Sequence, residues 1–178
     1  LSRVINSGEY KPSKTKPSIS PSMDIQVASN FERLLYDLVG EDDVKVKSLM
    51  DKLKNEGGYS LNDKEIGHIK NYFSASTISD KSTKETLKKV YDENQVLVDP
   101  HTATAFKSAE INSAGETMLV LGTAHPCKFP DVVKEATGVE PKIPENIKNI
   151  LNKKESYAIL DNSIDIIKRH ILERINEN

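Results

Sequence analysis

The sequence has few of the residues that mark several large classes of protein. Its 178 residues include one cysteine, Cys127, which excludes an intramolecular disulfide and fits a reducing cytoplasm. The four histidines show no metal-ligand spacing, and no Gly-x-Ser-x-Gly sequence marks a serine-hydrolase nucleophile. No stretch approaches the roughly 20 apolar residues of a membrane-spanning helix, and no signal-peptide pattern opens the chain. We therefore expect no metal site and no membrane association.

An excess of charge of one sign is also missing. The chain carries 25 Lys and Arg against 27 Asp and Glu, a net charge of −2, so we expect no nucleic-acid partner. Its eight glycines are dispersed, and none forms a glycine-rich loop that could hold a phosphate. The chain begins at Leu1 without a methionine. We expect a soluble, cytoplasmic part of a larger protein.

Proline and periodicity divide the first 72 residues. Residues 1–28 contain Pro12, Pro17 and Pro21 among polar residues, which predicts an extended connection without a core of its own. Residues 29–72 predict a helical cluster. Its three helices are expected from Ser29 with a Ser29–Glu32 capping box, over 43–55, and over 62–72 with Asn62 or Asp63 as the cap.

Residues 73–140 alternate between strand and helix patterns. The runs Val96–Val98 and 117–121 read as buried strands, and helices are expected after a Ser82–Glu85 capping box, over 101–111 and over 130–137. This order predicts parallel βα units, hence an α/β fold.

Residues 141–178 follow as a C-terminal helical segment after Pro141 and Pro144, with helices near 145–153 and 162–176. The last helix is expected to bury its apolar residues, which are Ile164, Ile167, Ile171, Leu172 and Ile175.

The most informative segment is the turn that follows the second expected strand. The apolar run ends at Gly122, and Thr123 and His125 follow at once, with Pro130 placed to start a helix. Polar groups beyond the carboxyl end of a strand commonly face a ligand in open α/β sheets. The sequence Gly-Thr-Ala-His-Pro-x-Lys-Phe over residues 122–129 resembles a signature near the C-terminus of threonine synthases, which are pyridoxal-phosphate enzymes.

Two further motifs carry the same resemblance. Ser-Pro-Ser-Met-Asp-Ile over 20–25, followed by Ser-Asn-Phe-Glu-Arg-Leu-Leu over 29–35, is similar to the bacterial and fungal branch of the family. Asp-Pro-His-Thr-Ala over 99–103 is similar to a turn of the same enzymes. The motifs stand in the family's order and anchor roughly residues 18 to 137.

The resemblance implies a fold and a reaction. The fold is the C-terminal part of a tryptophan-synthase-β-like pyridoxal-phosphate enzyme, with parallel strands, flanking helices and a helical cluster. The reaction is the conversion of O-phospho-L-homoserine and water to L-threonine and phosphate. The Schiff-base lysine and the phosphate cradle of such enzymes are missing from this chain, so we expect it to be inactive alone.

The resemblance also places Thr123, whose hydroxyl would meet the pyridine nitrogen of the cofactor. The alternative is that this hydroxyl only satisfies the backbone of its turn. His101 and His125 are candidates to line the pocket, where imidazoles can bind phosphate or exchange protons, although each could instead shape its turn through a backbone contact.

Three residues outside these turns are weaker candidates. Asn30 and Arg33, at a helix N-terminus, suit a substrate phosphate, but Arg33 could simply pair with Asp37. Lys128 follows the key turn and is a candidate for that reason, but its side chain could instead simply face water.

Other functions remain open at this stage. The chain could be part of another pyridoxal-phosphate lyase or deaminase of the same fold, or a non-catalytic module that binds a ligand or a partner. Uncovered strands at 96–98 and 117–121 would expose apolar surface, so we expect the chain to associate with itself or to cover this surface with its own segments.

Overall fold

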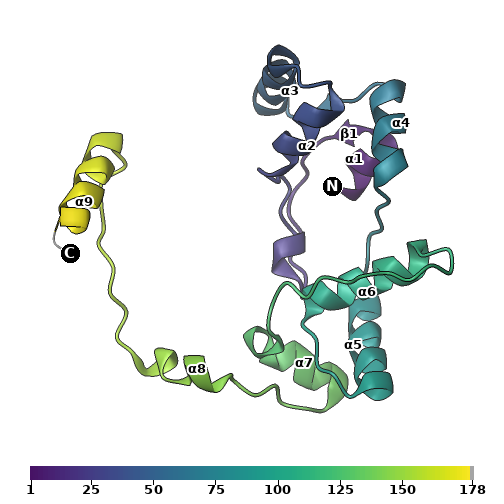
Figure 1. The fold of residues 1–178 in the computed structure, drawn as a ribbon, viewed down its shortest axis with the longest axis vertical. Coiled ribbons are helices and arrows are strands. Elements are labelled where there is room, and N and C mark those ends of the chain that lie inside the picture. The colour runs from purple at the N-terminus through teal and green to yellow at the C-terminus, as the bar shows by residue number, and fades with distance from the viewer. Residues whose placement is uncertain (177–178) are drawn as a thin grey trace. The chain divides into compact units, whose positions relative to one another are not determined.

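The computed structural model describes residues 1–176. The chain divides into two units, the first over Leu1–Lys142 and the second starting at Ile143. The elements of the first unit are α1 (Ser2–Ser7), β1 (Glu9–Tyr10), the 3-10 helix η1 (Pro21–Met23), α2 (Phe31–Leu38), α3 (Asp43–Asn55), β2 (Tyr59–Ser60), α4 (Asp63–Tyr72), α5 (Asp80–Asn94), α6 (Pro100–Asn112), η2 (Pro126–Lys128) and α7 (Pro130–Thr137) (Figure 1).

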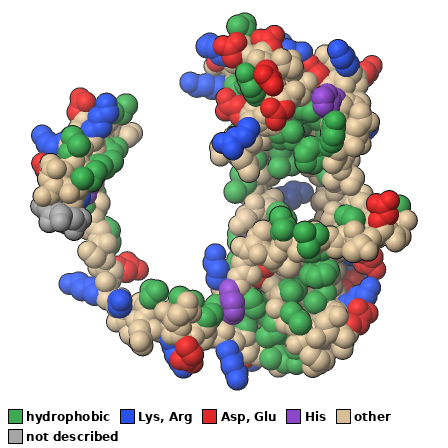
Figure 2. Space-filling view, viewed as in Figure 1, with side chains coloured by type: hydrophobic (Ala, Val, Ile, Leu, Met, Phe, Trp, Pro, Cys, Tyr) green, Lys and Arg blue, Asp and Glu red, His purple; other side chains and the backbone are tan. Residues whose placement is uncertain are grey.

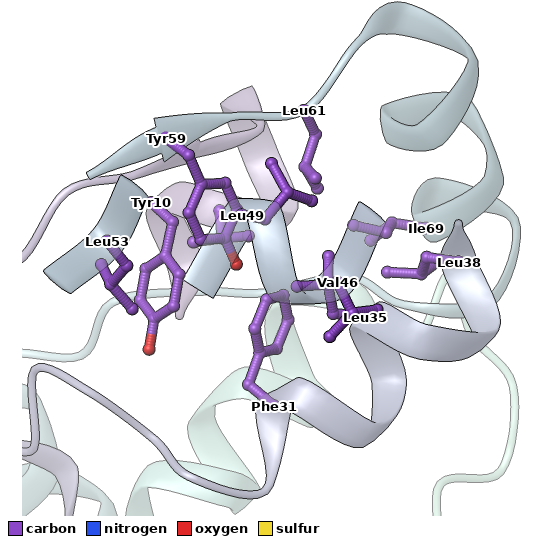
Figure 3. Close-up of a cluster of buried hydrophobic side chains, with 11 residues drawn as sticks. Tyr10, Phe31, Leu35, Leu38, Val46, Leu49, Leu53, Tyr59, Leu61 and Ile69 are labelled. Carbon is purple, nitrogen blue, oxygen red and sulfur yellow. The ribbon is translucent and has the colours of Figure 1, made fainter. Parts of the chain in front are cut away.

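The N-terminal cluster, residues 1–72, contains the main apolar core. Helices α2, α3 and α4 confirm the three helices predicted from periodicity, and their apolar faces meet as Figure 3 shows. The ring of Tyr10 lies edge-on to Phe31 and Tyr59, at centroid distances of 5.4 and 5.3 Å. The buried members of this core are Val4, Tyr10, Phe31, Leu35, Leu38, Val46, Leu49, Leu53, Tyr59, Leu61 and Ile69.

The first ten residues differ from the extended connection expected over 1–28. They form α1, which ends at Gly8 with φ 75°, and β1, which pairs antiparallel with β2. Val4 and Tyr10 are both buried. The Tyr10 ring contacts the rings of Phe31 and Tyr59, which lie far along the chain. Between residues 11 and 28 the chain runs without regular structure except for η1, as its prolines predict.

Neither of the two expected capping boxes is formed, whereas the expected cap at Asn62 is. Asn62 caps α4 and exchanges hydrogen bonds with Glu65, which confirms the predicted cap. The N-cap of α2 is Asn30, without a side-chain bond, so the Ser29 box is wrong. Helix α5 is capped by Ser79 instead of Ser82, because the run of polar residues before the helix offers more than one capping frame.

Helices α5, α6 and α7 form a second group in the same unit. Both α6 and α7 pack against α5, and Leu87, Ala103 and Val133 are buried, one on each helix. The predicted helices over 101–111 and 130–137 are confirmed by α6 and α7, and Gly138 ends α7 with φ 76°. The linker Phe73–Ser79 between the two groups has no regular structure.

The parallel strands expected at Val96–Val98 and 117–121 are not present in the described residues. The only sheet found there is the two-stranded pair of β1 and β2. Both runs are instead irregular, and Leu119 is 90% exposed. A strand requires a neighbour to satisfy its backbone amides and carbonyls, and the described part of the chain offers neither run such a neighbour.

The second unit consists of α8 (Glu145–Lys148), the 3-10 helix η3 (Ile150–Asn152) and α9 (Ile164–Asn176). Helix α9 confirms the helix expected over 162–176. The expected burial of its apolar side chains is wrong: Ile164 is 72% exposed, and hydrophobic side chains lie on the surface of α9 in Figure 2. The period-3.6 pattern predicts an apolar face of the helix, but no other element in the described part of this unit covers that face.

Candidate functional site

The turn after Gly122 presents Thr123 to solvent. Within the described residues the Thr123 hydroxyl makes no hydrogen bond, so it does not satisfy the backbone of its turn. The segment that follows is well defined: η2 is capped by His125, whose Nδ1 accepts the Cys127 amide hydrogen at 3.2 Å. Helix α7 then begins at Pro130. The turn therefore offers one exposed, uncommitted hydroxyl on an anchored segment.

His125 and Lys128 follow Thr123 in sequence. His125 uses Nδ1 for the cap of η2, while the side chain as a whole is exposed, which leaves Nε2 available to a ligand. Lys128 is exposed on η2. Both positions are compatible with a pocket completed by other parts of a protein.

His101 has a different environment, at the N-terminus of α6. Its side chain is 6% exposed, and both ring nitrogens are engaged. Nδ1 lies 2.8 Å from Asp99 Oδ1, and Nε2 accepts the amide hydrogen of Ser22 at 3.2 Å. The ring also contacts that of Phe129 at a centroid distance of 4.8 Å. No ring nitrogen is therefore left to bind a phosphate, which is one of the pocket-lining roles that the sequence suggests for His101.

Asp99 holds this arrangement together. It is fully buried and caps α6 by accepting the backbone amide hydrogens of His101 and Thr102 at 2.9 and 3.3 Å. Burial alone would raise the pKa of this carboxyl, but hydrogen bonds from Thr102 and His101 outweigh it and lower the pKa below its ordinary value. Asp99 is therefore a carboxylate. The sequence reasoning missed it, although an Asp directly before Pro at a helix start is a strong capping signal.

A cleft of about 970 Å³ lies in the first unit, between the N-terminal cluster and α5 and α6. Its lining is rich in hydroxyl groups and includes Ser20, which is 3% exposed and whose Oγ has no hydrogen-bond partner among the described residues. Asp24 and Asp80 line it too, whereas no lysine, arginine or histidine side chain of the described residues does. The cleft can therefore bind polar groups, but it has no basic side chain for a phosphate.

Asn30 and Arg33 differ in their relation to this cleft. Asn30 lines it, and its side chain makes no capping bond to α2. Arg33 is exposed on α2, does not line the cleft, and forms no ion pair with Asp37 among the described residues. Of these two candidates, which the sequence suggests for the same phosphate, only Asn30 therefore lines the cleft.

The described part of the chain has neither a metal-binding cluster nor a membrane-spanning helix. No group of three or more His, Cys, Asp or Glu side chains is placed there to hold a metal ion. No helix between residues 1 and 176 is long and apolar enough to cross a membrane.

Comparison with known proteins gives consistent matches. A family model described as "Threonine synthase, C-terminal" matches residues 102–171. The threonine synthase of Pseudomonas aeruginosa is 36% identical over 179 residues, which cover 99% of this chain and 38% of that protein.

Solved structures agree. The crystal structure of PLP-bound threonine synthase from Brucella melitensis matches with a TM-score of 0.83 and 40% identity, over 97% of this chain and 38% of that one. Threonine synthase from yeast matches with a TM-score of 0.78 and 30% identity, over 100% of this chain and 40% of that one. The chain therefore spans less than half the length of these relatives.

Proposed function

We propose that this chain belongs to the threonine synthase family and forms the C-terminal part of an enzyme. The enzyme converts O-phospho-L-homoserine and water to L-threonine and phosphate. The family assignment rests on similarity along nearly the whole chain. Because the chain spans about 38% of the length of its relatives, the anchoring lysine and the phosphate cradle are assigned to the remaining part of the complete enzyme. A cytoplasmic location, expected from the single cysteine, belongs to the same proposal.

The observation that carries the proposal is the free hydroxyl of Thr123. It lies in the segment that resembles the family's signature, it is exposed, and it is not used by its own turn. A neutral hydroxyl can donate a hydrogen bond to an unprotonated ring nitrogen or accept one from a protonated nitrogen. Thr123 therefore fits the position facing the pyridine nitrogen of pyridoxal phosphate.

When bound, pyridoxal phosphate would supply an electron sink for the negative charge that develops on the substrate's carbon atoms. The contribution of this chain is then binding and orientation. The Thr123 hydroxyl would hold the ring nitrogen, and exposed His125 and Asn30 would line the substrate pocket. The helices of the first unit would cover the site and limit the access of water.

Arg33 carries a positive charge, which the side chains lining the cleft lack. Its exposed guanidinium could bind the substrate phosphate if the remaining part of the enzyme carries the substrate to α2.

The exposed apolar segments of the chain support the same proposal. Residues 96–98 and 117–121 would become parallel strands when the rest of the enzyme supplies neighbouring strands, which would bury side chains such as Leu119 and Leu121. The exposed apolar face of α9 would likewise pack against that part.

Substitution of Thr123 in the complete enzyme tests the proposal. Thr123→Val keeps the shape of the side chain and removes its hydroxyl, so we expect kcat to fall about 10- to 100-fold, the cost of one strong hydrogen bond. Thr123→Ser should retain most of the activity. The melting temperature should change little, because valine has nearly the volume of threonine and the Thr123 hydroxyl makes no hydrogen bond within the described chain.

The matched control is Thr15→Val, which removes an exposed threonine hydroxyl far from the turn in sequence. If Thr123→Val and Thr15→Val have the same activity, or if Thr123→Val lowers only the melting temperature, Thr123 does not serve the cofactor.

A further inference from the structure

The three sequence motifs that resemble the family meet at one imidazole. His101 belongs to the Asp99–Ala103 motif, its Nε2 binds the amide of Ser22 in the 20–25 motif, and its ring contacts Phe129 at the end of the 122–129 motif. Ser22 lies 79 residues away in sequence. The contact with His101 therefore joins segments that local structure could not bring together.

The segment that His101 holds is the 18–24 loop, which comprises residues 18 to 24. Internal hydrogen bonds shape this loop: Ser20 accepts the Met23 amide hydrogen at 2.8 Å, and Asp24 accepts that of Ser18 at 2.9 Å. The loop contributes Ser20 and Ser22 to the lining of the cleft. Its other hydrogen bond to the α5–α7 group is a long, exposed one of 3.4 Å, from the Ile19 amide to Asp80.

The partners of His101 determine which form of the imidazole fits. Asp99 is a carboxylate and can only accept, so Nδ1 must carry the hydrogen. The Ser22 amide can only donate, so Nε2 must be unprotonated. Both contacts are made by the neutral Nδ1–H tautomer and by no other form.

We propose that His101 is a positioning residue, which in its neutral Nδ1–H form fastens the 18–24 loop and the Thr123 turn to the N-terminus of α6. It does not exchange protons with substrate, because its ring is buried and both nitrogens are occupied. Its effect on the reaction is indirect: the loop forms a wall of the cleft, and Phe129 ends the segment that contains Thr123. Only the kinetic consequence rests on the proposed function.

Protonation would oppose this arrangement, because a hydrogen on Nε2 would point at the Ser22 amide hydrogen. Asp99 is the ionisable side chain in contact with the ring. The elements packed against it also carry Asp24 in the loop and Cys127 and Lys128 on η2, but no contact from these three to the ring is found in the described structure. Asp99 would tolerate the imidazolium, whereas the Ser22 contact would be lost.

Hydrogen–deuterium exchange of the complete protein tests the proposal with two substitutions. His101→Asn places an amide nitrogen near the position of Nδ1 and keeps a donor for Asp99, but it lacks an acceptor for Ser22. His101→Gln reaches the position of Nε2 and offers an oxygen to the Ser22 amide. We expect exchange of peptides covering 18–25 to quicken about three- to tenfold in His101→Asn, the worth of one hydrogen bond, and much less in His101→Gln.

His68→Gln is the matched control, since His68 is exposed on α4 and distant in sequence from both motifs. It should leave exchange of 18–25 unchanged. Equal exchange in His101→Asn and His101→Gln, or faster exchange throughout α2–α4 as well, would overturn the proposal, because His101 would then serve only general stability.

Loss of activity in His101→Asn with unchanged exchange of 18–25 would contradict the proposal too, while leaving the proposed function intact.

Discussion

Two buried tyrosine hydroxyls of the N-terminal cluster have different environments. Tyr10 accepts the Ala28 amide hydrogen at 3.0 Å, whereas the Tyr59 hydroxyl is buried without a partner among the described residues. The rings pack edge-on, so each makes similar apolar contacts. The pair separates the contribution of a hydroxyl from that of its ring.

Substitution of each tyrosine by phenylalanine should therefore have opposite effects. Tyr59→Phe removes an unsatisfied buried polar group and should raise the free energy of unfolding by about 1 kcal/mol, while Tyr10→Phe should lower it by about 1 kcal/mol. Urea denaturation of the chain, followed by circular dichroism, measures both. A loss of stability in Tyr59→Phe would mean that its hydroxyl has a partner.

The same pair predicts a difference at alkaline pH. Burial, and then the nearby Tyr10 and Glu32, raise the pKa of Tyr59 above its ordinary value. The folded state thus favours the neutral phenol, and this contribution is present below the unfolded pKa of about 10 and is lost as the pH rises above it. Tyr59→Phe should lose less stability than the unsubstituted chain between pH 9 and 11.

Sequence reasoning at the scale of single residues identified positions better than contacts. The place of Thr123 after Gly122 marks it as a candidate, and in the structure it is exposed and makes no hydrogen bond to any described residue. His101 was singled out too, but its partner Ser22 lies 79 residues away, and nothing local indicates that contact. Its other partner, Asp99, is a helix cap and could have been predicted.

Helix α4 has a reciprocal capping box at its N-terminus. Asn62 and Glu65 satisfy each other's backbone amides, and Glu65 also binds Lys45 of α3. Burial opposes ionisation of Glu65, but the hydrogen bonds from Lys45 and Asn62 outweigh it and lower its pKa. The carboxylate therefore stabilises the fold above its unfolded pKa, and the contribution is lost as the pH falls through the folded pKa.

Removal of this cap should destabilise the N-terminal cluster. Asn62→Ala should lower the free energy of unfolding by about 1 kcal/mol, the usual worth of an N-cap. Ser29→Ala is the matched control: Ser29 resembles a capping-box residue in sequence, but α2 is capped at Asn30. Thermal unfolding at pH 7 compares them. Equal losses would show that Ser29 caps α2 in solution.

Elements with local causes were predictable, and those with distant causes were not. Helices α3, α4, α6 and α7 follow from periodicity, caps and glycine stops, all within a few turns of chain. Strands at 96–98 and 117–121 were predicted from composition, but a strand also needs a neighbour, which this chain lacks in its described part. The strand β1 at Tyr10 was missed because its partner, Tyr59, lies in another segment.

At the scale of the molecule, large apolar side chains lie exposed over several segments. Leu119, Leu121 and Ile164 are each at least 70% exposed. Such surfaces favour association. We therefore expect the chain alone to self-associate at micromolar concentration, and the complete enzyme to cover these residues.

Light scattering with a charged substitution tests this expectation. Leu119→Asp should weaken association of the isolated chain, because a carboxylate resists burial in an apolar contact. Val44→Asp, at a 73% exposed position on α3, is the control and should associate as the unsubstituted chain does. A monomeric unsubstituted chain, or equal association of both variants, would rule out an interface at 117–121.

The proposed function of the whole molecule leads to a direct measurement. The complete protein is incubated with pyridoxal phosphate and O-phospho-L-homoserine, and the products are identified and quantified, with this chain alone as the comparison. We expect the complete protein to release L-threonine and phosphate in equal amounts, and this chain alone to release neither. A keto acid in place of L-threonine would indicate another lyase of the same fold, and the absence of any reaction would contradict the account altogether.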